Sequence, residues 1–172
     1  MTKLLSIFAL AFASACSLGS CSNSTSSTPG TSAEHIAQDS DFANFAAWTQ
    51  TVPHRMGFDP SGLLSSGMAH GVNDPTISRY IYLKQASATV DASGNFPVGT
   101  VFYKNLKMNG MNVMGTGMVK RGGSYNSTGR SCEYFLLSAD GKITSRGDTL
   151  MGGMCQSCHN SAPSGHDYIF TK

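Results

Sequence analysis

The sequence is poor in charged residues and rich in none of the residue types that would indicate a nucleic-acid-binding or a multi-span membrane protein. Asp, Glu, Lys and Arg make up 13% of 172 residues, about half the usual share of roughly 25%. Twelve Lys and Arg against ten Asp and Glu leave a formal net charge of +2. This balance provides no clustered basic face for a nucleic acid, and it excludes a strongly charged tail. The length suits a single domain with an appendage.

The first twenty residues have the composition of an export signal. After an early lysine, residues 4–15 are mostly apolar, but the run is too short to span a bilayer as a helix. Two processing sites fit: the Ala-Ser-Ala of residues 13–15 suits cleavage before Cys16, whereas residues 18–21 (LGSC) resemble the bacterial lipobox, with Cys21 as the lipid anchor. We favour Cys21 because a leucine lies three residues before it. Both alternatives predict an exported protein.

The segment after Cys21 consists of small polar residues. Residues 22–32 read SNSTSSTPGTS, a composition that cannot form a core and is typical of a flexible tether. We therefore expect a lipoprotein-type signal peptide over 1–20, a tether over 21–35 and a folded domain over 36–172. The protein would lie on the periplasmic side or at the outer membrane of a bacterium, held there by its lipid alone, since no later segment could span a membrane.

Hydrophobic patterning in the domain predicts a helix, then several strands, then a short helix. Apolar residues at three- and four-residue spacing predict a helix from a cap at Ser40 to about Gln50, and residues 54–76 have a loop composition. A helix over 150–160 follows a candidate cap at Asp148 or Thr149. Strands are expected over 77–83, 99–106, 112–121, 131–138, 143–145 and 168–170. The expected fold class is α+β, mainly an antiparallel sheet with flanking helices.

The strongest chemical signal lies near the carboxyl end, where residues 155–159 read CQSCH. This C-x-x-C-H spacing is typical of c-type haem attachment. Two intervening residues put the sulfurs of Cys155 and Cys158 on one side of a helical turn, at a separation that matches the two haem vinyl groups. The next residue, His159, can then ligate the iron axially. Attachment of this haem outside the bacterial cytoplasm agrees with an export signal.

Three alternatives for this motif stay open. A structural zinc needs four ligands, and only Cys132 and His166 could complete the set, without a second paired spacing. A thioredoxin-like redox pair needs a βαβ context that the strand pattern does not provide. A disulfide between Cys155 and Cys158 would be strained by their closeness in sequence. Cys132 itself is expected to be a buried strand residue.

The ligand at the sixth position of the iron would decide the function. An electron carrier usually fills this position with methionine or histidine, whereas an open position binds or transforms a small molecule. Methionines in such segments more often fill gaps in the core. The candidates are Met108, Met111, Met114, Met118, His54, His70 and His166.

Three segments together carry a resemblance to a known family. They are RYIYL (Arg79–Leu83), FPVGTVFYK (Phe96–Lys104) and MCQSCHNSAPSGHDYIFTK (Met154–Lys172). In this order they resemble the cytochromes P-460 and their relatives, the cytochromes c′-beta. The similarity runs from about residue 70 to the end of the chain.

The resemblance implies a largely antiparallel β fold that carries one c-type haem and is often a homodimer. It implies His159 as the proximal iron ligand and an open distal side. Lys104 occupies the place of the lysine that P-460 cytochromes join covalently to the haem edge, and Arg79 matches the pocket arginine. Strand alternation puts Lys104 on one face with Phe102. Arg79 could donate hydrogen bonds to a bound nitrogen–oxygen ligand.

The activity that the resemblance implies is oxidation of hydroxylamine or a similar small nitrogen compound, with electrons passing to a periplasmic acceptor. Active P-460 enzymes can place a carboxylate shortly before the haem motif, where it helps proton removal. Here residues 149–154 contain none, and the nearest acids are Asp148 and Asp140. A non-catalytic c′-beta-like protein that binds nitric oxide or carbon monoxide is therefore one alternative. An electron-transfer cytochrome with methionine as sixth ligand is the other.

Overall fold

The computed structural model describes residues 33–51, 55–56, 76–162, 165–167 and 169. The chain divides into two compact units, Met1–Gly30 and Thr31–Lys172, and the described residues all belong to the second. The expected export signal, both candidate processing sites and most of the expected tether lie outside the described residues, as do His54 and His70. No described helix is long and apolar enough to cross a membrane.

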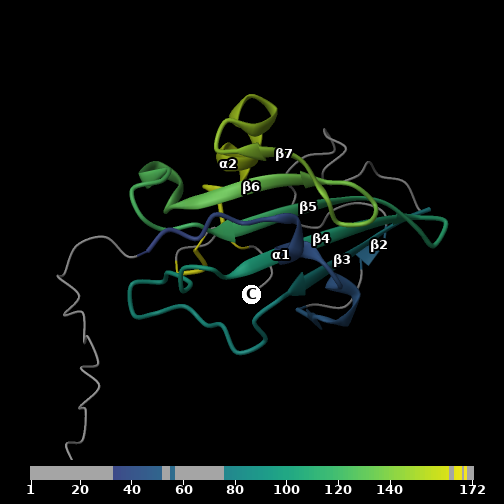
Figure 1. Ribbon diagram of the computed structural model, residues 1–172, viewed down its shortest axis with the longest axis horizontal. Coiled ribbons are helices and arrows are strands. Elements are labelled where there is room, and N and C mark those ends of the chain that lie inside the picture. Colours follow the sequence, from purple (N-terminus) through teal and green to yellow (C-terminus); the bar gives the residue numbers. More distant parts are fainter. Residues whose placement is uncertain (1–32, 52–54, 57–75, 163–164, 168, 170–172) are drawn as a thin grey trace, which may run out of the picture. The chain divides into compact units, whose positions relative to one another are not determined.

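One antiparallel sheet forms the body of the second unit (Figure 1). The strands lie side by side in the order β1-β3-β4-β5-β6-β7, and β2 also pairs with β3. The strands are β1 (Thr49–Gln50), β2 (Arg55–Met56), β3 (Ile77–Leu83), β4 (Val101–Met108), β5 (Met111–Lys120), β6 (Cys132–Leu137) and β7 (Ile143–Gly147). Because β3 to β7 are consecutive in both sequence and space, the sheet is a meander in which hydrogen-bonded neighbours follow one another along the chain; the β4–β5 turn is tight, whereas the β3–β4 and β5–β6 connections are long.

The predicted fold class is confirmed: an α+β fold, mainly antiparallel sheet. β3 begins and ends at the predicted residues, and β4 to β6 differ from the predicted ranges by one or two residues at their ends. The helix predicted over 150–160 is present as a 3-10 turn, η3 (Leu150–Gly153), followed by the helix α2 (Met154–His159). Of the strand predicted over 168–170, the structure describes Ile169, which is buried outside any strand.

The helix predicted from Ser40 to Gln50 is wrong in its extent. The structure has a single-turn helix, α1 (Asp39–Phe42), then a 3-10 turn, η1 (Phe45–Ala47). Asn44 separates them in a left-handed conformation with φ of 55°, which a continuous right-handed helix does not contain. The break turns both Phe42 and Phe45 onto the sheet, where they are buried. Packing of these two rings therefore outweighs the helical periodicity of the segment.

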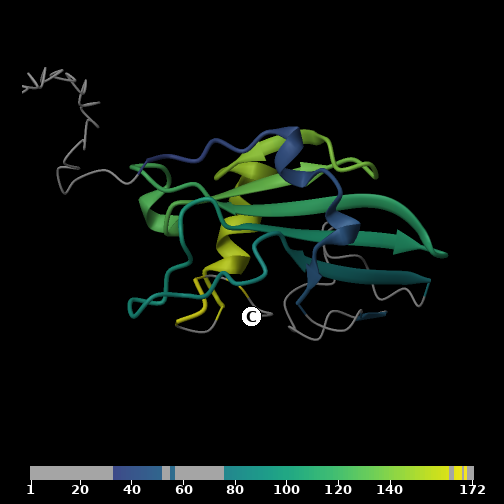
Figure 2. The same ribbon diagram turned by 60° about the horizontal axis from the view of Figure 1, so that its bottom comes forward.

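The two faces of the sheet carry two different cores. On the aromatic face, α1 and η1 cover a cluster of Ala37, Phe42, Phe45, Tyr82, Val101, Tyr103, Val119, Phe135 and Leu137. On the other face, which we call the motif face, the cluster is Leu83, Ala88, Phe96, Phe102, Met118, Cys132, Tyr134 and Ile169. Leu150 and Cys155 pack against this second cluster. The turned view in Figure 2 lets the reader follow α2 across the sheet and α1 on the aromatic side.

Candidate functional site

The C-x-x-C-H motif lies on α2, which the chain enters through a tight turn. Met151, Gly152 and Gly153 all have positive φ values, of 54°, 68° and 82°. Glycine adopts this conformation without steric cost, so the Gly-Gly pair allows the chain to reverse immediately before the helix. The side chain of Gln156 donates a hydrogen bond of 3.1 Å to the hydroxyl of Thr128, in the β5–β6 connection. This bond fixes the helix against the body of the sheet.

Both motif cysteines are free thiols and are half-buried. In a helix, residues three apart lie on one side, so both sulfurs can bond to one planar group along that side. Cys155 packs against the motif-face cluster. Burial raises the pKa of its thiol, and the positive charge of Lys104 acts in the opposite direction.

The histidine of the motif sits against a buried aromatic ring of the sheet. The rings of His159 and Tyr134 have centroids 5.3 Å apart at an interplanar angle of 52°. Tyr134 is 2% exposed, and its side chain belongs to the motif-face cluster. A fixed ring of this kind limits the orientations of the half-buried imidazole. No local sequence pattern predicts this contact, because Tyr134 and His159 are distant in the chain.

Strand register brings the predicted lysine and arginine to the motif face. In β4, Phe102 pairs with Leu83, Lys104 with Ile81 and Leu106 with Arg79. Paired residues project to the same side of a sheet. Because Phe102 belongs to the motif-face cluster, Lys104 and Arg79 also lie on that face, one and two steps further along. Arg79 is 3% exposed.

A second lysine of the same strand points the other way. The ammonium group of Lys107 lies 4.7 Å from the centre of the Tyr80 ring. Tyr80 packs against the aromatic-face cluster. Strand β4 therefore offers one lysine to each face, and both lysines are half-buried. This pair provides a matched comparison for any role assigned to Lys104.

Of the acids nearest to the motif in sequence, Asp140 lies in the exposed turn between β6 and β7. It accepts a hydrogen bond from Ser138 and pairs with Lys142 at 3.6 Å. Asp148 lies near Tyr125, and its charge contributes to raising the pKa of that phenol, although burial is the main cause. Neither residue belongs to the motif-face cluster.

A buried ion pair, which sequence reasoning missed, closes one end of the motif face. Lys120 is 8% exposed and Asp167 is 2% exposed. The ammonium group of Lys120 lies 2.8 Å from Asp167 Oδ2 and donates a 2.6 Å hydrogen bond to the carbonyl of Arg130. Asp167 Oδ2 also accepts 2.7 Å from the backbone N–H of Phe96. The segment that follows the motif is thus fixed to β5.

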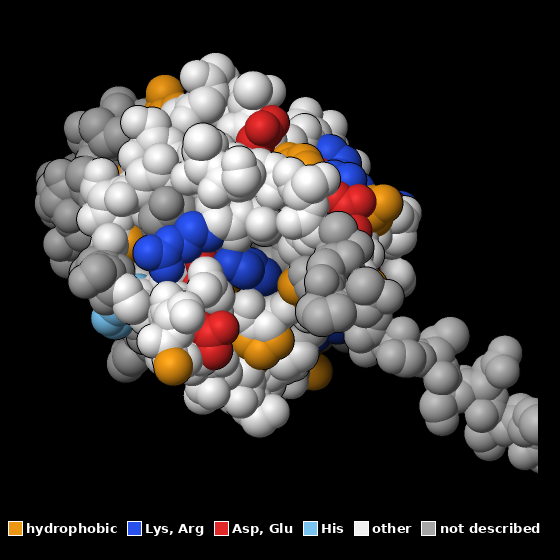
Figure 3. Space-filling view, turned by 90° about the vertical axis from the view of Figure 1, so that its left-hand side faces the viewer, with side chains coloured by type: hydrophobic (Ala, Val, Ile, Leu, Met, Phe, Trp, Pro, Cys, Tyr) orange, Lys and Arg blue, Asp and Glu red, His pale blue; other side chains and the backbone are white. Residues whose placement is uncertain are grey.

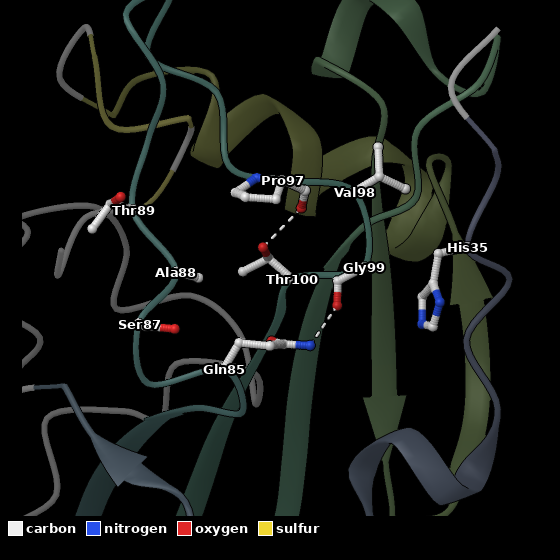
Figure 4. A pocket seen from close by; sticks show the side chains of 9 residues that line it. All are labelled: His35, Gln85, Ser87, Ala88, Thr89, Pro97, Val98, Gly99 and Thr100. Carbon is white, nitrogen blue, oxygen red and sulfur yellow. Dashed lines mark hydrogen bonds between the residues drawn. The ribbon is translucent and has the colours of Figure 1, made fainter. Parts of the chain in front are cut away.

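A cavity of the described surface is lined by the N-terminal segment and the β3–β4 connection and by none of the motif residues. It has a volume of about 490 Å³ and is lined by His35, Gln85, Ser87, Ala88, Thr89, Pro97, Val98, Gly99 and Thr100 (Figure 4). The Gln85 amide donates 2.7 Å to the carbonyl of Gly99 and accepts 3.0 Å from the N–H of Val101. Its polar atoms therefore stabilise the loop rather than project into the cavity.

The surface at this end of the molecule is mostly uncharged. Figure 3 views the side that lies at the left of Figure 1, and it shows a few Lys and Arg side chains near the centre with acidic groups beside them. Among the described residues, no group of three or more His, Cys, Asp or Glu side chains is placed to hold a metal ion. The sparse charge agrees with the composition.

The fold and the motif together define an α+β domain that presents two thiols, an imidazole, a lysine and an arginine around one face of an antiparallel sheet. Scans of protein-family models, of curated proteins and of solved structures found no match to this chain. The donor set suits a c-type haem: two thiols on one helical turn, the next imidazole half-buried, and an apolar wall behind them. Cys155, Cys158 and His159 could hold the group.

Proposed function

We propose that the protein is an exported mono-haem c-type cytochrome that resembles the P-460 cytochromes. Cys155 and Cys158 would hold the haem by thioether bonds, and His159 would ligate its iron. The substrate would be hydroxylamine or a similar small nitrogen compound, and the electrons would pass to a periplasmic acceptor. Cys21 would anchor the chain to a membrane through lipid.

The placement of Lys104 is the observation that carries this proposal. In sequence, Lys104 is more than fifty residues from the motif, yet in the fold it shares the motif face and its charge acts on the Cys155 thiol. A lysine on this face would lie near the edge of a haem held by that thiol. That position is the one that the resemblance assigns to a haem-linked lysine.

Bound haem supplies an iron that can accept electrons from a small ligand. The residues of this chain orient and enclose that ligand. Tyr134 packs on His159 and limits the rotation of the imidazole. Arg79 is buried on the motif face, where its guanidinium could donate hydrogen bonds to a nitrogen–oxygen ligand. Leu83 and Phe102 contribute to the apolar wall that keeps water from the site.

One observation favours the second candidate, a haem protein that binds nitric oxide or carbon monoxide without turnover. Oxidation of hydroxylamine releases protons, which a nearby base would accept. Asp167 lies next to the motif-face cluster, but its oxygens are already bonded to Lys120 and the backbone of Phe96. A gas-binding site needs an apolar wall and an open iron, and the motif-face cluster provides the wall.

An optical spectrum of the reduced protein, made in a bacterium that attaches c-type haem, tests the proposal. We expect a high-spin ferrous haem that binds carbon monoxide at once, and a haem peptide whose mass includes Cys155, Cys158 and one haem. Replacement of Cys155 and Cys158 by serine should give colourless protein, whereas Cys132→Ser should keep the haem. Colourless wild-type protein would refute the haem assignment, and a low-spin spectrum that resists carbon monoxide would indicate the electron carrier.

The two lysines of β4 separate an enzyme from a gas binder. A lysine-linked haem gives a red-shifted Soret band, which we expect Lys104→Ala to abolish and Lys107→Ala to keep, since Lys107 points to the other face. Turnover of hydroxylamine with an artificial acceptor should fall with the band. An ordinary Soret band and no turnover in the wild type would favour the gas binder.

The proposed lipid anchor has its own test. Release of the Cys21→Ser variant from membranes would support the anchor, and soluble wild type would argue against it.

A further inference from the structure

The β4–β5 hairpin carries methionines that the haem proposal does not use. Four of the nine methionines of the chain, Met108, Met111, Met114 and Met118, fall within eleven residues. The two strands turn through Asn109-Gly110, with φ values of 50° and 81°, which are the left-handed conformations of a two-residue type I′ turn. Met108 and Met111 flank this turn and pair with each other.

Strand register gathers three of these side chains on one face of the hairpin. Met108 pairs with Met111, and Leu106 pairs with Met114. In a regular strand, residues 111 and 114 would project to opposite faces. Here the pairing skips Val113, because the register shifts between Leu106 and Lys107. Such a bulge adds one residue to β5, and beyond it the side chains alternate with an offset of one position. Met114 therefore projects to the same side as Met108 and Met111.

Strand pairing puts the three methionine side chains within reach of one another, and all three are at least partly exposed. Directly paired residues have Cβ atoms about 4.5–5.5 Å apart, and the diagonal neighbours about 7–8 Å apart, which is within reach of long side chains. Met111 is 69% exposed and Met108 is 39% exposed, and Met114 is half-buried. Met118, in contrast, is 6% exposed within the motif-face cluster, so it does not belong to this group.

The hairpin holds the three methionines in a fixed arrangement. On its opposite face, the Asn105 amide donates 2.8 Å to the side chain of Asn112. At the turn, the backbone N–H of Asn109 donates 3.0 Å to the carbonyl of Thr76. These bonds fix the register without using the methionine face.

We propose that Met108, Met111 and Met114 form a binding site for copper(I). Thioether sulfur is a soft, neutral ligand that selects Cu(I) among the metals available to a protein. Three sulfurs on one face provide a trigonal set. Binding displaces no proton and transfers no electron, since the metal stays Cu(I) throughout. The three methionines lie on the motif face beyond the residues assigned to the haem: Met108 is four residues along β4 from Lys104, about 13 Å at the usual rise of a strand. Met114 and Arg79 lie at the same level of the sheet, on either side of β4.

Anaerobic titration of the intact, haem-containing protein with Cu(I) alone, against a coloured Cu(I) chelator, tests the proposal. We expect one Cu(I) per chain beyond the amount bound by the triple variant Met108→Leu/Met111→Leu/Met114→Leu. Each single leucine variant should weaken binding by about tenfold or more, since one ligand of three is lost while side-chain volume is kept. Met151→Leu is the matched control, because Met151 is 38% exposed and lies outside the hairpin.

The pH dependence identifies the ligands independently of these variants. Thioethers carry no titratable proton, so the affinity should be constant between about pH 5.5 and pH 8, whereas cysteine and histidine sites lose affinity as they protonate. Equal Cu(I) binding by the wild type and the triple variant would overturn the proposal. A fall in affinity at the acid end, or an equal loss in Met151→Leu, would also overturn it.

Discussion

The two faces of the sheet differ in their side chains: aromatic rings pack together on one face, and two cationic side chains lie beside the apolar cluster on the other. On the aromatic face, Phe45 stacks on Tyr103 with ring centroids 4.2 Å apart, and Phe42 lies 5.1 Å from Phe135. On the motif face, the same strands present Lys104 and Arg79 beside the apolar cluster. Alternate residues of one strand thus contribute to the aromatic core on one face and to the motif face on the other, since neighbouring positions project to opposite sides.

Glycine at a single position shows how closely the aromatic face is packed. A Cβ atom on Gly115 would lie within 2.6 Å of three side-chain atoms of Tyr103, two of the ring and the hydroxyl oxygen. The absence of a side chain there leaves room for the Tyr103 phenol over β5. The aromatic face is therefore filled by its own rings, whereas the motif face carries Lys104 and Arg79 along the strands beyond Phe102.

The largest expected effect concerns thiol reactivity on the motif face. Burial raises the pKa of Cys132 from 9.0 to about 12, which lowers its thiolate fraction at neutral pH by about a thousandfold. We expect iodoacetamide to label Cys132 at least about a thousandfold more slowly in native protein than in urea, as followed by mass spectrometry. Comparable rates in the two conditions would show that this part of the motif face is open.

On the aromatic face, Phe42→Ala should cost stability without changing chemistry. Phe42 is 0% exposed, and deletion of a buried phenyl ring lowers the free energy of unfolding by about 3–5 kcal/mol. Urea unfolding measures this loss. The reduced spectrum of the proposed haem should be unchanged, because the ring lies on the face opposite α2. Ile36→Ala, at a site 50% exposed, is the control, and an altered spectrum in Phe42→Ala would contradict the separation of the faces.

Glu133→Gln should have a smaller effect on the same face. Glu133 is 2% exposed and accepts 2.7 and 2.8 Å hydrogen bonds from Arg146, and Arg121 lies 3.3 Å away. Loss of its charge should lower the free energy of unfolding by about 2–3 kcal/mol. Thermal unfolding of Glu34→Gln gives the comparison, since that more exposed partner of Arg121 should contribute below about 1 kcal/mol. Equal losses would mean that burial of Glu133 adds nothing.

The smallest expected effect is a pH dependence at α1. Burial acts to raise the pKa of Asp41, but a hydrogen bond from Gln38 N–H and the nearby Lys84 hold it below its ordinary value of 3.8. A carboxyl with a lowered folded pKa stabilises the fold above its unfolded pKa, and this contribution is lost as pH falls through the folded value. Asp41→Asn should cost about 0.5–1 kcal/mol at pH 7.

The difference between wild type and Asp41→Asn should shrink toward zero in urea titrations carried out below pH 3.8. A difference that stays constant across that range would show that the Asp41 charge is not the cause. Lys84→Met removes the partner ammonium group, which lies 2.9 Å from Asp41. It should reproduce part of the loss at pH 7.

Local sequence signals predicted the strands well, because β-branched and aromatic residues mark β3 to β6 directly. They failed at α1, where Asn44 breaks the helix so that Phe42 and Phe45 can both reach the sheet. Alternation correctly predicts that Lys104 and Phe102 project to the same face. Only the folded structure shows that α2 packs on this face. The Lys120–Asp167 and Glu133–Arg146 pairs join distant segments, and no local pattern encodes such contacts.

Through its ion pair with Lys120, Asp167 near the carboxyl end is part of the folded structure. A protein truncated before position 167 would keep an ammonium group inside the fold with its counter-ion removed, which is costlier than losing a solvent-exposed tail. An affinity tag is therefore better placed upstream of Glu34 than fused after deletion of the final six residues. The same carboxylate also closes the loop that begins at Phe96, so one substitution there would loosen two distant parts of the chain together.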